Sequence, residues 1–100
     1  MPSKLERDFQ SSLIREIKDR WRGCIVLKND SQYKQGVPDL TVLYGPHWFI
    51  LEVKKSLGAP FRPNQEYYIE QWGVMGHAAV IAPENKKEIL DAMDDAFHPC

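Results

Sequence analysis

The sequence has few cysteines and no long apolar run, and both shortages narrow the classes of protein it can belong to. Its two cysteines are Cys24, inside an apolar stretch, and Cys100, the last of 100 residues. This placement favours neither a disulfide nor a cysteine metal site. No apolar run approaches the roughly 20 residues of a membrane-spanning helix, and residues 1–6 lack the apolar core of a signal peptide. The sequence therefore predicts a cytoplasmic protein, in its own cell or in an infected host, without a membrane partner.

A large excess of charge is also missing. The chain has 13 Lys and Arg against 14 Asp and Glu, a formal net charge of −1 at pH 7. Strongly basic nucleic-acid binders have a different composition. The charge is unevenly distributed, however, because residues 84–100 hold five acids and two lysines, which leaves the other residues at a net +2.

The length and the periodicity of apolar residues predict one domain, residues 1–100, of the α/β class. Apolar residues recur at helical spacing in three segments, and β-branched and aromatic residues gather in four others. The predicted helices are residues 3–20, 63–75 and 84–97, and the predicted strands are 24–28, 36–44, 48–55 and 77–82. The order is α-β-β-β-α-β-α, with a central mixed sheet flanked by helices and with residues 24–28 as a buried strand.

The two middle strands form a predicted antiparallel hairpin that carries unexpected charges. With its turn at residues 44–47, Leu43 faces Trp48 and, counting back, Asp39 faces Glu52. Lys54 leaves the same face of its strand as Glu52, because the two are two residues apart. The hairpin thus places two carboxylates side by side with an amine one pleat away.

Two like charges opposite each other destabilise a sheet, so this pair needs a compensating cation. Carboxylate oxygens without Cys or His suit a hard ion such as Mg²⁺ or Mn²⁺, which keeps several waters and favours phosphate oxygens as further ligands. The three histidines, His47, His77 and His98, are scattered and offer no convincing ligand. The pattern predicts phosphodiester chemistry.

The motifs Gly36-x-Pro38-Asp39-Leu40 and Glu52-x-Lys54, followed by Gln65 at the start of a helix, resemble a known signature. They are similar to PD-(D/E)XK nucleases and, more narrowly, to VRR-NUC domains and archaeal Holliday-junction resolvases, over about residues 5–83. The resemblance implies a restriction-endonuclease-like core and a Mg²⁺- or Mn²⁺-dependent endonuclease. The expected substrate is branched DNA such as a four-way junction, cut to leave a 5′-phosphate. The small stand-alone format resembles phage-encoded nucleases.

The resemblance also assigns roles to individual residues. Asp39, Glu52, the Val53 backbone carbonyl and Glu6 are the implied metal ligands, and Lys54 would orient the attacking water and stabilise charge on the phosphate. Gln65 would bind a phosphate or a water through its amide. The structural alternatives are that Lys54 merely neutralises an acid and that Gln65 is an ordinary polar residue of a first helical turn. The family usually has Ser or Thr where Arg62 precedes Pro63, which puts the cap of that helix in doubt.

Glu6 has a second possible role. Ser3-Lys4-Leu5-Glu6 matches a capping box, in which the Glu6 side chain would bind the Ser3 backbone N–H. The polar segment 29–36 is similarly open to two interpretations. It is either a solvated connector or a substrate loop in which Lys34 contacts phosphate and Tyr33 a sugar or base.

The small size of the domain predicts a homodimer, because one copy offers little surface to a duplex. Candidate contact residues are Phe61, Tyr67 and Trp48. Two alternatives to a junction-selective enzyme remain open. One is a nicking or structure-nonspecific DNA nuclease, and the other is a catalytically inactive nucleic-acid-binding module of the same fold.

Overall fold

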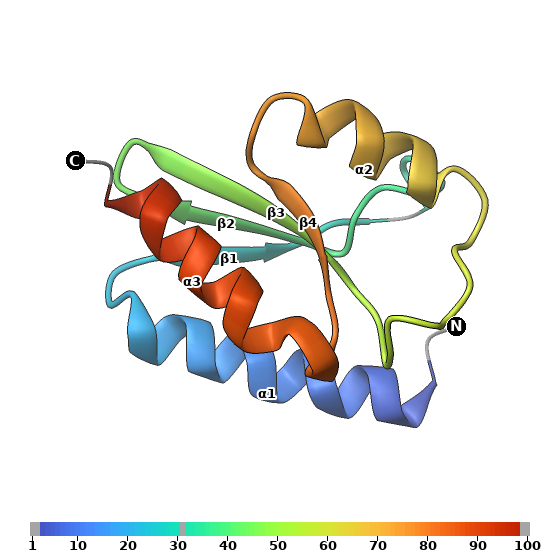
Figure 1. Ribbon diagram of the computed structural model, residues 1–100, viewed down its shortest axis with the longest axis horizontal. Coiled ribbons are helices and arrows are strands. Elements are labelled where there is room, and N and C mark those ends of the chain that lie inside the picture. Colours follow the sequence, from blue (N-terminus) through green and yellow to red (C-terminus); the bar gives the residue numbers. More distant parts are fainter. Residues whose placement is uncertain (1–2, 31, 99–100) are drawn as a thin grey trace.

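Four strands form one mixed sheet in the order β1-β2-β3-β4, and three α-helices pack on its two sides (Figure 1). This computed structural model describes residues 3–30 and 32–98. The strands are β1 (Ile25–Lys28), β2 (Leu40–Tyr44), β3 (His47–Val53) and β4 (Ala78–Ile81), of which β4 alone pairs in parallel. The helices are α1 (Lys4–Arg20), α2 (Gln65–Gly73) and α3 (Lys86–Phe97), with the 3-10 helix η1 (Pro83–Asn85) before α3. The chain is a small α/β domain, and the predicted order of elements is confirmed.

The β2–β3 hairpin has the predicted register. Leu43 lies opposite Trp48, and Gly45-Pro46 form a tight turn closed by the pair Tyr44 and His47. Gly45 has φ +60°, a value that suits glycine because it has no Cβ. Since Leu40 pairs with Leu51, the next position along places Asp39 opposite Glu52.

The hydrophobic core lies between one face of the sheet and the helices α1 and α3, which Figure 1 shows below the strands. Alternate residues of β2 and β3 point into it, as the two-residue period of a strand requires. The buried side chains are Leu13, Ile17, Trp21, Leu40, Val42, Phe49, Leu51, Val53, Ile81, Leu90, Met93 and Phe97. The predicted apolar stripes of α1 and α3 supply most of the helical members.

The N-terminus of α1 confirms half of the predicted capping box. Ser3 Oγ accepts a hydrogen bond of 3.1 Å from the Glu6 backbone N–H. The Glu6 carboxylate turns to Arg62, so the structure shows the Ser3 half of the box and a different partner for the Glu6 side chain. Leu5, in the first turn of α1, is 71% exposed. In Figure 1 the first turns of α1 extend beyond the ends of the strands.

The strand β1 corrects another prediction, because it is an exposed edge strand. Ile25 and Leu27 are 54% and 46% exposed, while Val26 between them packs against the core. Strand order puts β1 at the margin of the sheet, with β2 as its only neighbour among the described residues. Cys24 precedes this strand and is half-buried, whereas Cys100 lies outside the described residues.

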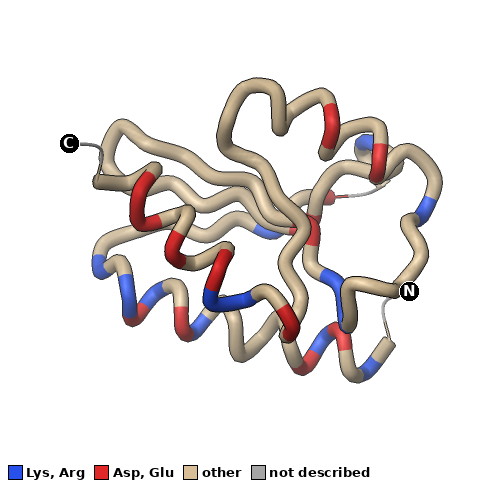
Figure 2. The backbone as a smooth tube through the Cα atoms, viewed as in Figure 1, with Lys and Arg blue, Asp and Glu red and all other residues tan. Residues whose placement is uncertain are grey.

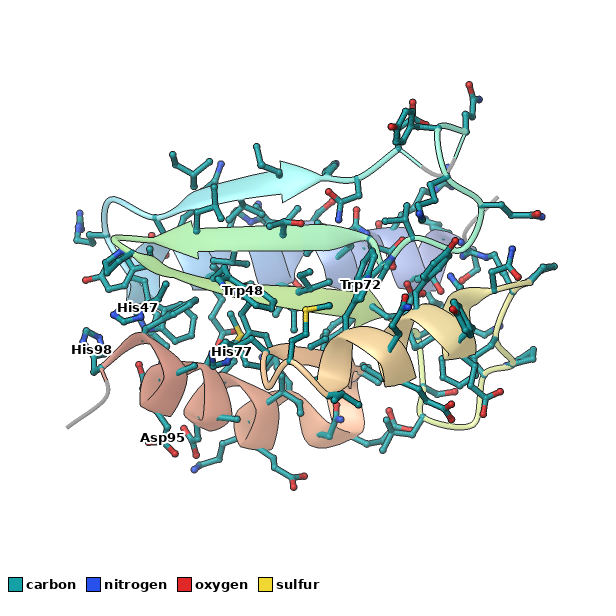
Figure 3. The ribbon with its side chains drawn as sticks, turned by 90° about the horizontal axis from the view of Figure 1, so that it is seen from above. His47, Trp48, Trp72, His77, Asp95 and His98 are labelled. Carbon is teal, nitrogen blue, oxygen red and sulfur yellow. The ribbon has the colours of Figure 1, made fainter. Side chains whose placement is uncertain are left out.

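The helix α2 begins at Gln65, two residues later than predicted. Asn64 has φ 69°, in the left-handed region, so Pro63 and Asn64 form a turn before the helix. Tyr68, Ile69 and Trp72 of α2 are half-buried. Seen from above in Figure 3, α2 lies on the β4 side of the sheet.

The acidic residues of α3 are prominent in Figure 2. They are not simply solvated, because Arg20 of α1 pairs with Asp91 and Asp94, and Trp21 Nε1 donates to Asp94 Oδ1 at 2.7 Å. These contacts join α1 to α3. Within the described part of the chain, no helix combines the length and apolarity that crossing a membrane requires.

Candidate active site

Asp39 and Glu52 meet where β2 begins and β3 ends. Asp39 Oδ2 accepts a hydrogen bond of 2.9 Å from the Val53 backbone N–H, which ties the residue before β2 to the end of β3. The Asp39 carbonyl accepts a second bond, of 2.8 Å, from the Asn29 backbone N–H. Glu52 is fully buried on β3. Local pairing of the strands therefore fixes both carboxylates, as the hairpin register predicted.

Gly36 explains how the segment before Asp39 is held against the start of α2. It has φ +88°, and a Cβ built on it would lie 2.5 Å from both Asn64 Cβ and the Pro63 carbonyl oxygen. Only glycine permits this approach of two backbones. Lys34 Nζ also lies 5.1 Å from the centre of the Tyr68 ring. The loop that carries Asp39 and the helix that carries Gln65 are thus packed together.

Gln65 joins Glu52 to Lys54 in a buried polar network. Gln65 Nε2 donates to Glu52 Oε2 at 2.7 Å, and Lys54 Nζ donates to Gln65 Oε1 at 2.8 Å. Lys54 Nζ also donates to the Pro60 carbonyl at 3.0 Å and lies 3.7 Å from Glu52 Oε2. Lys54 and Gln65 are only 3% and 2% exposed, so their polar groups rely on hydrogen bonds within the protein, one of which they share.

Burial and like charge raise the pKa of both acids. The pKa of Glu52 rises from 4.5 to about 8, mainly because the carboxyl is buried and then because of the negative charge of Asp39, while Lys54 and Arg62 oppose the shift. The pKa of Asp39 is also raised, first by burial, against the effect of its hydrogen bond from Val53 N–H. Two neighbouring acids that hold a proton in this way are a site that a cation can stabilise.

One oxygen of Glu52 is available for such a cation. Glu52 Oε1 is buried and has no hydrogen-bond partner, whereas Oε2 is bound by Gln65. A buried oxygen without a partner costs free energy unless it holds a proton or binds an ion. Together with Asp39 it forms an all-oxygen donor pair that fits Mg²⁺ or Mn²⁺. The Val53 carbonyl as a metal ligand stays a prediction. What the structure shows of Val53 is the hydrogen bond from its backbone N–H to Asp39.

Glu6 lies near this pair but is occupied by another partner. Its Oε2 accepts a hydrogen bond of 2.8 Å from Arg62, and its charge contributes to the raised pKa of Asp39. Across the described ranges, no three or more His, Cys, Asp or Glu side chains are grouped closely enough to hold a metal ion. Asp39, Glu52, Lys54 and Gln65 are therefore brought together as one cluster, and Glu6 stands beside it.

Arg62 and Asn29 were missed as site residues by sequence reasoning. The Arg62 backbone N–H donates to Gln65 Oε1 at 2.7 Å, and its guanidinium holds Glu6. Asn29 Nδ2 donates to the Pro38 carbonyl at 2.8 Å and to Thr41 Oγ1 at 3.0 Å, which fixes the segment around Asp39. A signal for Arg62 was its position before Pro63, where the resembling family has a cap. The sequence carried no such signal for Asn29.

The remaining candidates lie at different distances from the cluster. Tyr33 is 90% exposed in the loop before Asp39, so it is free to contact a partner. Figure 3 shows His47 and His98 at one end of the molecule and His77 beside Trp48. His47 opens β3 and Lys54 follows its end, so a strand of seven residues, about 20 Å long, separates His47 from the cluster.

Comparison with known proteins adds no relative to this picture. No protein-family model matches the chain, and no curated protein matches it.

Proposed function

We propose that the protein is a metal-dependent endonuclease that hydrolyses DNA phosphodiester bonds, with a PD-(D/E)XK site on a restriction-endonuclease-like core. The observation that carries this proposal is the buried pair Asp39 and Glu52, with Glu52 Oε1 unpartnered and Lys54 3.7 Å from Glu52 Oε2. Opposed buried acids destabilise a fold through repulsion and lost solvation, and acids perturbed in this way cluster at functional sites. The buried amine of Lys54 and the buried amide of Gln65 lie against this pair of acids. This arrangement supports a hydrolytic role over a purely structural one.

The donor set supports Mg²⁺ or Mn²⁺ as cofactor. Asp39 and Glu52 would hold the ion, with Glu6 and the Val53 carbonyl as further candidate ligands. When bound, the ion would polarise the scissile phosphate and favour ionisation of the attacking water. The remaining chemistry belongs to the side chains around the pair.

Lys54 is the residue suited to act on the reacting groups. Its amine is fixed by Gln65 and the Pro60 carbonyl, so its charge is held in place before the substrate arrives. A preorganised ammonium stabilises the negative charge that develops on phosphoryl oxygens and orients the attacking water. Gln65 acts as the positioning residue, because its amide bridges Lys54 and Glu52.

Branched DNA is the proposed substrate, and a homodimer is the proposed form. A four-way junction has two-fold symmetry, which two identical sites match. One small domain with a net charge of −1 holds linear duplex weakly. A nicking or structure-nonspecific nuclease is the alternative enzyme.

The test is cleavage of labelled linear, flapped and four-way DNA in Mg²⁺, Mn²⁺ or EDTA. The parent should cut only with metal and cut four-way DNA fastest. Asp39→Asn and Glu52→Gln should be inactive, whereas Glu66→Gln, which changes an exposed acid on α2, should cut like the parent. DNA binding without cleavage in any metal would instead favour an inactive binding module.

A further inference from the structure

Arg62 contacts two residues of the site, one through its side chain and one through its backbone. Its guanidinium donates to Glu6 Oε2 at 2.8 Å, and its backbone N–H donates to Gln65 Oε1 at 2.7 Å. The two ends of the ion pair differ in exposure, since the Glu6 side chain is 9% exposed and that of Arg62 is 40% exposed. The acid is therefore fixed inside the protein, while the cation can turn toward solvent.

A pocket of about 280 Å³ lies beside this ion pair. Its lining includes Glu6, Lys54, Lys55 and Arg62, with Pro60 and Phe61 beside them. Three of them are cations, and Glu6 is the single acid. A pocket with this lining, next to the proposed catalytic Lys54, suits the phosphate of a DNA strand, which Arg binds in a bidentate manner.

The ion pair creates a conflict over Glu6. Asp39 and Glu52 supply only two acids, and Glu6, whose charge acts on Asp39, is held by Arg62. Arg62 also acts on the pair itself, because its charge opposes the raised pKa of both Asp39 and Glu52. A divalent ion and the Arg62 guanidinium would thus compete for the same group of acids. The Glu6 carboxylate would bind each of them less well while the other is bound.

We propose that Glu6 exchanges Arg62 for a divalent metal ion, and that the freed guanidinium binds a backbone phosphate of the substrate in the adjacent pocket. This inference rests on the proposed metal-dependent nuclease function. It makes Arg62 a phosphate-binding residue that becomes available when the site holds metal. Since coupling between two ligands is reciprocal, DNA in the pocket must then tighten metal binding by the same factor.

The first measurement is a calorimetric titration with Mn²⁺ in the absence of DNA. Arg62→Gln removes the competing cation and should raise Mn²⁺ affinity about threefold or more, a change in the range of one partly exposed ion pair. Lys55→Gln is the matched control, because it removes one positive charge from the same pocket lining without breaking the ion pair of Glu6. It should raise the affinity clearly less.

The second measurement is binding of a synthetic four-way junction in Ca²⁺ and in EDTA. Ca²⁺ should tighten binding by the parent, and Arg62→Gln should lose most of that gain. The slope of log affinity against log salt should fall by about one for Arg62→Gln in Ca²⁺ and stay unchanged in EDTA. Lys55→Gln should weaken binding equally in both conditions.

The outcomes separate this inference from the function on which it rests. Equal Mn²⁺ affinity of Arg62→Gln and the parent, or an equal rise in Lys55→Gln, would overturn the exchange at Glu6 and leave the nuclease proposal intact. An unchanged Ca²⁺ gain in Arg62→Gln would remove the phosphate role. If the parent binds no Mn²⁺, both proposals fail.

Discussion

At the scale of single residues, Glu52 is the side chain on which the properties of the site depend. It is fully buried, faces Asp39, and has one oxygen without a partner. With a pKa of about 8, it is mostly protonated at neutral pH in the absence of a cation. Metal binding must therefore displace a proton, so the apparent affinity for Mn²⁺ should rise with pH toward 8.

The raised pKa of Glu52 makes stability of the metal-free protein depend on pH. Between about pH 4.5, the ordinary value, and about pH 8, the folded state binds more protons than the unfolded state. Stability is therefore lost as pH rises through this interval, by up to about 1.4 kcal/mol per unit from this group. Glu52→Gln keeps the shape without the ionisation, so it should lack this loss and be more stable than the parent at pH 8.5.

Urea unfolding in EDTA from pH 5.5 to 8.5 measures this difference. Glu66→Gln, at an exposed site on α2, should keep the slope of the parent. A Glu52→Gln protein with the same slope as the parent would show that Glu52 is ionised throughout.

Lys54→Met should remove turnover and keep metal binding. Methionine preserves much of the buried stem, while the ammonium that acts on water and phosphate is lost. Single-turnover cleavage should fall by about 100-fold or more, in line with the loss of one preorganised charge. Calorimetric Mn²⁺ titration beside single-turnover kinetics checks both parts, and loss of metal binding with unchanged chemistry per bound metal would refute the assigned role.

The residue scale also shows what the sequence could reveal of the site. Asp39 and Glu52 could be paired because a hairpin register follows from the turn and the alternation of apolar residues. The contacts of Arg62 with Glu6 could not be predicted, because these residues are 56 positions apart in the chain and meet only through packing. The same holds for Asn29, whose amide fixes the Pro38 carbonyl across a loop.

At the scale of elements, the loop before β2 packs directly against the start of α2, and Gly36 is the residue that permits this close contact. Gly36→Ala should destabilise the protein by more than the roughly 1–3 kcal/mol of a strained φ alone, because its Cβ would meet Asn64 and Pro63 at 2.5 Å. It should also lower cleavage, since moving either segment separates Asp39 from Gln65.

Two other glycines supply matched controls for this variant. Gly23 has a similar φ of +89° with nothing within 4 Å of a built Cβ, so Gly23→Ala reports the backbone cost alone. Gly58 has neither restriction, and Gly58→Ala should change stability by less than about 0.5 kcal/mol. Thermal unfolding of Gly36→Ala, Gly23→Ala and Gly58→Ala compares their losses of stability. If Gly36→Ala costs no more than Gly23→Ala, the loop is not held against α2.

Predictions of elements succeeded where periodicity was long and failed where tertiary position decides. The apolar stripes of α1 and α3 fixed which side packs on the sheet. The burial of β1 was wrongly predicted, because a continuous apolar run does not reveal whether a strand lies at the centre or the edge. The start of α2 was missed because Asn64, which lies against the Gly36 loop, adopts a left-handed conformation that ends the preceding turn before the helix begins.

At the scale of the whole molecule, surface area limits what one copy can do. The described chain exposes 6280 Å². A specific duplex interface of about 1,000–2,500 Å² would take roughly a sixth to two fifths of that area. The acids on α3 occupy part of the remainder (Figure 2). A second copy would supply the missing surface and a second site.

The exposure of apolar side chains bears on where the predicted dimer contact could lie. Trp48 is half-buried against His77, whereas Phe61 and Tyr67 are 41% and 59% exposed, with the Phe61 ring 5.0 Å from Lys54 Nζ beside the proposed site. Ile25 and Leu27 are better placed, because exposed apolar side chains on an edge strand tend to be covered by a partner. In the view of Figure 3, no helix of the described residues lies in front of β1.

We therefore predict a homodimer that contacts through β1 and prefers four-way over linear DNA. Leu27→Lys should give a monomer with an intact fold and a reduced preference for the junction. Met75→Lys, at a residue 58% exposed after α2, should stay dimeric. Light scattering at micromolar concentration and competition binding in Ca²⁺ test both variants beside the parent. A monomeric parent that binds linear and four-way DNA equally would overturn the junction preference, and a dimeric Leu27→Lys would place the contact elsewhere.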